Sequence, residues 1–105
     1  MSEVLLRFAE LVPDENGRRY RAQACGSQMA GDTRWQGWVE FVPIDGGEAI
    51  ASGRETTQPN RTDAEYWATG LTPVYLEGAL QRARHPLRLP AEQPLPPPAF
   101  VEPRK

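Results

Sequence analysis

The amino-acid sequence predicts an α+β fold in which an antiparallel sheet comes first and two short helices follow. Residues 3–58 contain four runs that favour strands, separated by glycine-containing turns. After Pro59 this pattern gives way to capping residues and helical spacing. Seven of the eleven prolines fall in residues 86–105, which predicts an extended proline-rich tail. We therefore expect one α+β domain over residues 1–85 and a tail over residues 86–105.

The sheet is expected to be a four-stranded antiparallel meander. Its strands are predicted over residues 4–12, 18–29, 35–43 and 48–58, and Asn16-Gly17 favours a hairpin between the first two. The third strand alternates most clearly, with Trp35, Gly37, Val39 and Phe41 on one face. In the first strand Val4, Leu6 and Phe8 are expected on the core face. A helix over residues 3–11 remains an alternative, because leucine, alanine and glutamate are good helix formers.

Two helices are expected after the sheet, packed on one of its faces. Thr62 and Glu65 match a capping box, which predicts a helix over residues 63–69 with Gly70 as its stop. Thr72 and Pro73 are typical of the N-terminus of a second helix, which is expected to run to about residue 84. It carries an apolar stripe, Leu76, Ala79, Leu80 and Ala83, that would cover one sheet face.

Composition narrows the functional classes. The 105-residue chain has a formal net charge of −2, so as a whole it is not attracted to nucleic acid or to anionic membranes. The start lacks the features of a signal peptide, and no apolar run is long enough for a membrane span. The single cysteine, Cys25, fits a reducing compartment. We expect a cytoplasmic protein that does not bind membranes.

The residue types needed for catalysis are scarce. His85 and Cys25 are the only histidine and the only cysteine, too few for a structural zinc site, and nothing in the sequence brings them together. The glycines match neither a phosphate-binding loop nor a dinucleotide fingerprint. We therefore predict no catalytic residue, no metal site and no cofactor, and a binding module rather than an enzyme.

Two groups of residues are candidates for binding. The polar stretch 53–70 joins the sheet to the helices, and junctions of this kind often carry binding groups; its candidates are Arg54, Glu55, Thr57, Gln58, Asn60, Arg61 and Tyr66. The second group would lie on the sheet face without helices, and consists of Arg19, Arg21 and Trp38. Turn and cap chemistry explains much of the first group, and an arginine–glutamate ladder could explain the second.

Three functions remain open. The first is an adaptor that binds a protein partner through the sheet face or the tail, which contains a PxxP motif at Pro94–Pro97. The second is a nucleic-acid-associated protein that uses the arginines and Trp38. The third is a small-ligand binder or enzyme centred on residues 54–66. We expect the first, and the sequence does not predict an oligomeric state.

One resemblance concerns the centre of the chain. The segments GWVEFVP, DGG, RETTQPNR and YWATGLTPVYLEGAL, between Trp35 and Leu80, resemble a set of short bacterial proteins of unknown function. The resemblance covers nearly half of the chain. It implies a bacterial cytoplasmic setting, and it assigns no activity and no functional residue.

Overall fold

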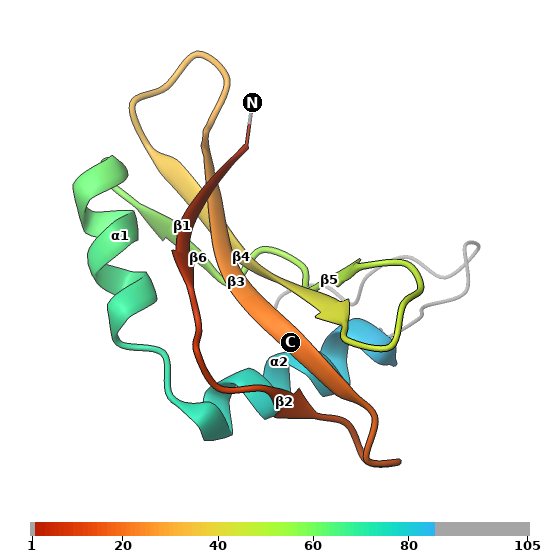
Figure 1. Ribbon diagram of the computed structural model, residues 1–105. Helices are drawn as coiled ribbons and strands as arrows, with labels where there is room; N and C mark the ends of the chain where they lie inside the picture. Colours follow the sequence, from red (N-terminus) through yellow and green to blue (C-terminus); the bar gives the residue numbers. More distant parts are fainter. Residues whose placement is uncertain (1, 86–105) are drawn as a thin grey trace, which may run out of the picture.

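The computed structural model describes residues 2–85 (Figure 1). They form a six-stranded antiparallel sheet followed by two helices, which confirms the predicted α+β class. The strands are β1 (Glu3–Arg7), β2 (Val12–Pro13), β3 (Arg19–Gln28), β4 (Trp35–Pro43), β5 (Ile50–Ala51) and β6 (Thr56–Gln58), and the helices are α1 (Arg61–Thr69) and α2 (Pro73–Arg84). The predicted tail, residues 86–105, lies outside the described residues.

The prediction of four strands is wrong, because both outer strands are broken. β1 and β2 pair with β3, while β5 and β6 pair with β4. The central pair is continuous, from Tyr20 opposite Pro43 to Gln28 opposite Trp35. An outer strand has a neighbour on one side only, so glycine and polar residues interrupt it easily. The path of the chain is still the expected meander.

The core lies between one sheet face and the two helices. Tyr20, Ala22, Val39 and Phe41 point to this face and pack against Leu76, Ala79 and Leu80 of α2. On the same face, the ring of Trp67 in α1 lies over Gly37. Both helices therefore cover the same side of β3 and β4 (Figure 1). The predicted core faces of β4 and α2 are confirmed.

The first strand departs from simple alternation. Val4 is opposite Cys25 and Leu6 is opposite Ala24, so the register shifts by one residue at Leu5. A bulge of this kind reverses which side chains face the core. Leu6 keeps the predicted orientation, but Val4 lies on the opposite face and is 36% exposed. The expectation of a core position for Val4 is therefore wrong.

The helix starts are set by short polar side chains. The prediction that Thr62 caps α1 is wrong, because Asn60 is the N-cap and its side-chain oxygen accepts the Asp63 N–H at 2.8 Å. The prediction for α2 is confirmed, since Thr72 Oγ1 accepts the Tyr75 N–H at 3.1 Å and Pro73 follows it. Within residues 2–85, neither helix is long and apolar enough to cross a membrane.

Candidate functional site

The polar stretch after β5 serves mainly to hold the fold together. The Glu55 carboxylate is 9% exposed; it accepts hydrogen bonds from the Tyr75 hydroxyl and, at 2.7 Å, from Arg82 Nη2. Tyr75 and Arg82 are seven residues apart, so they lie on one side of α2. Tyr75, and not the candidate Tyr66, lies beside Glu55. This contact ties the β5–β6 connection to α2.

The neighbouring candidates also have local partners. Gln58 Nε2 donates to Thr56 Oγ1 at 2.6 Å, and Asn60 caps α1. Arg61 pairs with Glu3 at 2.8 Å and with Glu65. Arg54, Thr57 and Tyr66 are exposed, and Tyr66 on α1 is 79% exposed. The structure therefore does not gather residues 54–66 into one site.

The sheet face without helices, here called the open face, carries the second group of candidates. Its side chains alternate with those of the core, and they include Val4, Arg7, Arg19, Arg21, Gln23, Cys25, Trp38, Glu40, Val42 and Ile44. Arg21 is opposite Val42, and Trp38 is opposite Cys25. On this face the Gln23–Glu40 pair lies between these two pairs. Trp38 is half-buried, and Val42 and Ile44 are 38% and 41% exposed. The exposed end of this face therefore combines arginines with aliphatic side chains.

The arginines of the open face differ from the others in their partners. Five of the nine arginines in residues 2–85 have a carboxylate within 4.0 Å: Arg18, Arg34, Arg61, Arg82 and Arg84. Among the described residues no ion pair is formed by the other four: Arg7, Arg19, Arg21 and Arg54. Glu40, the carboxylate on the open face, accepts a hydrogen bond from Gln23 Nε2 at 3.0 Å. Uncompensated positive charge therefore collects on this face, although the whole chain is acidic.

A hollow opens between β1 and β3 on this side of the sheet. Its volume is about 190 Å³ and it is lined by Arg7, Phe8, Arg21, Ala22, Gln23 and Val42. Two guanidinium groups and one amide thus surround a partly apolar depression, and none of the lining residues is acidic. A carboxylate is the complementary ligand, because guanidinium groups bind it with paired, charge-assisted hydrogen bonds. Arg7 was missed as a candidate, although alternation places it on the side opposite the expected core set.

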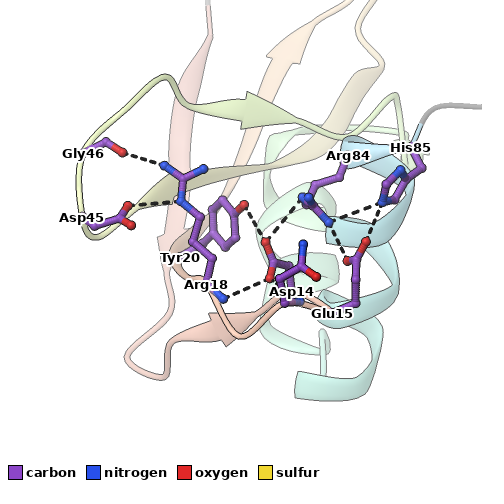
Figure 2. Close-up of polar contacts among 9 residues, drawn as sticks. Asp14, Glu15, Arg18, Tyr20, Asp45, Gly46, Arg84 and His85 are labelled. Carbon is purple, nitrogen blue, oxygen red and sulfur yellow. Dashed lines mark hydrogen bonds and ion pairs between the residues drawn. The ribbon is translucent and has the colours of Figure 1, made fainter.

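A second polar cluster lies between the β2–β3 turn and the C-terminal end of α2 (Figure 2). Asp14 is buried, and its Oδ1 accepts the backbone N–H groups of Asn16 at 2.8 Å and Arg18 at 3.0 Å. Its Oδ2 accepts the Tyr20 hydroxyl at 3.0 Å and lies 3.5 Å from Arg84 Nε. One carboxylate therefore holds the β2–β3 turn, the core tyrosine and the end of α2 together.

The outer part of this cluster joins the same turn to the end of α2. Glu15 pairs with Arg84 and accepts His85 Nε2 at 2.7 Å (Figure 2). The cluster contains acid–base residue types, but each is engaged with a partner. These side chains line neither the hollow on the open face nor a second one between residues 8–12 and α2. The arrangement joins the β2–β3 turn to the end of α2.

The pH dependence of stability should report on this cluster. The hydrogen bond from His85, aided by Arg84, lowers the pKa of Glu15 from 4.5 to about 2. A depressed folded-state pKa stabilises the protein above the unfolded value, and this contribution is lost as the pH falls toward 2. We expect the difference in melting temperature between the native protein and Glu15→Gln to shrink as the pH falls from about 5 to 2.5. A difference that stays constant would contradict this account.

Cys25 is not available as a nucleophile. It is 2% exposed, and burial, with the nearby Glu40 charge, raises the pKa of its thiol to about 12. At neutral pH the group therefore remains a thiol, and the thiolate is the reactive form. Within residues 2–85 no three histidine, cysteine, aspartate or glutamate side chains are grouped to hold a metal ion.

Comparison of the chain with models of protein families, with curated proteins and with solved structures finds no match. The resemblance to short bacterial proteins therefore stays a prediction.

Proposed function

We propose that this protein is a non-enzymatic binding module whose open face holds an acidic segment of a protein partner. The observation that carries the proposal is the set of arginines on this face, Arg7, Arg19 and Arg21, which no carboxylate of the described residues neutralises. Arginine is enriched at protein interfaces, where it combines charge with an apolar stem. The exposed side chains of Val42 and Ile44 supply apolar contact area beside these charges.

A protein segment suits this face better than a single-stranded nucleic acid. Single strands are held by aromatic side chains on which the bases stack. On the open face of β3 and β4 the aromatic residue is Trp38; it is half-buried, and the Gln23–Glu40 pair lies between it and Arg21 on this face. The side chains opposite Arg19 and Arg21 on the neighbouring strand, Ile44 and Val42, are aliphatic instead, and the half-buried Phe8 lines the hollow beside Arg21. Carboxylates separated by apolar residues would match this pattern along an extended strand.

Binding of a short acidic peptide to the full chain tests the proposal. The probe is a ten-residue peptide with glutamates around two leucines, and its counterpart carries lysines in place of the glutamates. We expect only the acidic peptide to bind, and the double variant Arg7→Ala/Arg21→Ala to weaken binding by about 5- to 30-fold, since two solvated charge contacts are lost. Raising the salt from 50 to 300 mM should weaken binding further, because exposed charges are screened.

A matched control separates the effect of losing arginines on the open face from the effect of a changed net charge. Arg18→Ala/Arg34→Ala changes the charge equally, but both side chains belong to ion pairs in turns, at 3.2 Å from Asp45 and 2.6 Å from Asp32. This variant should bind the acidic peptide within about 2-fold of the native protein. Equal weakening by both double variants would refute the assignment of the face. Tighter binding of a single-stranded oligonucleotide than of the acidic peptide would support the nucleic-acid function instead.

A further inference from the structure

A second hollow lies on the other side of the domain, where the outer strand is interrupted. β1 ends at Arg7 and β2 begins at Val12. Phe8 N–H still bonds to the Ala22 carbonyl at 3.0 Å, but residues 9–11 form no strand pairing with β3. Between this segment and the start of α2 is a hollow of about 240 Å³. It is lined by Phe8, Ala9, Glu10, Leu11, Val12, Leu71, Pro73, Leu76 and Glu77.

The size of this hollow limits what it can hold. An engineered apolar cavity of about 150 Å³ accommodates benzene, whereas pockets for drug-sized ligands and cofactors begin near 300 Å³. A hollow of about 240 Å³ therefore fits one bulky side chain such as leucine or phenylalanine. Its walls are apolar, since Leu11, Leu71 and Leu76 contribute to them. A leucine or phenylalanine that leaves water for these walls gains the free energy of apolar burial.

The charged groups of this hollow have one sign. The outer-strand segment contributes Glu10, and α2 contributes Glu77. The connection between the two helices contributes Leu71 and the first residue of α2 is Pro73, and neither carries a charge. Both glutamates are exposed, and among the described residues neither forms an ion pair with an arginine or a histidine. A cation beside an apolar group is therefore the complementary ligand.

We propose that this hollow is a second binding site, which takes a bulky apolar side chain flanked by lysine or arginine in a partner polypeptide. The apolar side chain fills the space between the outer strand and α2, and the flanking cations approach Glu10 and Glu77. The site is opposite in charge to the open face. The two hollows share Phe8, but their charged residues differ, so this site stands whether or not the open face binds an acidic segment.

The test is an NMR titration of the full-length protein with blocked five-residue peptides. The first peptide is Gly-Lys-Phe-Lys-Gly, the second replaces both lysines with glutamate, and the third replaces phenylalanine with alanine. We expect the first to shift the methyl signals of Val12, Leu71 and Leu76 and to bind at least about 5-fold more tightly than the second. The third should not saturate. Equal affinity for the first two peptides, or shifts confined to other methyl groups, would overturn the proposal.

Two variants separate what the charges of the hollow contribute to binding from what its apolar space contributes. Glu10→Gln/Glu77→Gln should remove most of the preference for lysine, while Glu3→Gln/Glu48→Gln, which changes the same charge on exposed residues outside the hollow, should leave it intact. Ala9→Trp places an indole at the mouth of the hollow, from an exposed position where the fold tolerates a larger side chain. It should abolish binding of the phenylalanine peptide while the methyl spectrum of the core remains native. Unchanged binding by Ala9→Trp would refute the site.

Discussion

Replacing Asp14 with alanine should lower the melting temperature by roughly 10 °C or more, since several contacts of one buried carboxylate are lost together and each such loss costs a small domain several degrees. The Tyr20 hydroxyl, on a residue 2% exposed, would lose its acceptor at 3.0 Å. Two backbone N–H groups of the β2–β3 turn would lose theirs. Arg84 would lose the carboxylate 3.5 Å from its Nε. Thermal unfolding followed by circular dichroism at pH 7 measures the effect.

Asp45→Ala is the matched control for this variant. It also removes an aspartate from a turn, but that carboxylate is 62% exposed and within residues 2–85 it pairs with Arg18 alone, at 3.2 Å. Exposed ion pairs contribute little to stability, so the melting temperature should change by no more than about 3 °C. Tyr20→Phe removes one of the three hydrogen bonds that the Asp14 carboxylate accepts, and its melting temperature should fall between those of the two aspartate variants. Equal effects of Asp14→Ala and Asp45→Ala would show that the buried carboxylate does not organise the domain.

The parts of the fold that follow from local periodicity could be predicted. Alternation placed Val39 and Phe41 of β4 on the core face, and helical spacing placed Leu76 and Leu80 on the buried side of α2. The breaks in the outer strands could not be predicted in this way. The bulge at Leu5 shifts the pairing by one residue without any glycine or proline within β1 to mark it, and it depends on the fit of β1 against β3. The predicted strand count and the predicted core position of Val4 are wrong for this reason.

For the candidate site, the sequence could predict only which residues of one strand share a face. Arg19 and Arg21 alternate with core residues of β3, so the sequence placed them on the open face together. Arg7 joins them through pairing of its strand with Gln23, a contact between residues distant in sequence. The partners of Asp14 and Glu55 on α2 are likewise distant in the chain, and no short-range pattern encodes them. Whether an arginine carries free charge or belongs to an ion pair depends on such contacts.

Gly37→Val should also lower the stability strongly, because it disturbs the contact between α1 and the sheet. A Cβ atom at this position would lie 2.8 Å from Trp67 Cζ3 and 3.0 Å from Thr56 Cγ2, closer than side chains pack. The indole would have to move, and α1 with it. We expect the free energy of unfolding to fall by about 1–3 kcal/mol, the usual cost of overpacking a core. Urea unfolding followed by tryptophan fluorescence measures the stability.

Two further variants decide whether the close approach of Trp67 is the cause. Gly53→Val adds the same side chain where no atom lies within 4 Å of the new Cβ, so it should change stability by at most about 0.5 kcal/mol. Trp67→Leu shortens the opposing side chain, so Gly37→Val should cost clearly less in that background, giving a coupling of at least about 0.5 kcal/mol. Additive effects would mean that the cost arises in the strand itself. Because Gly37 points away from the open face, the folded Gly37→Val protein should still bind the acidic peptide, which would separate the binding surface from the packing that supports it.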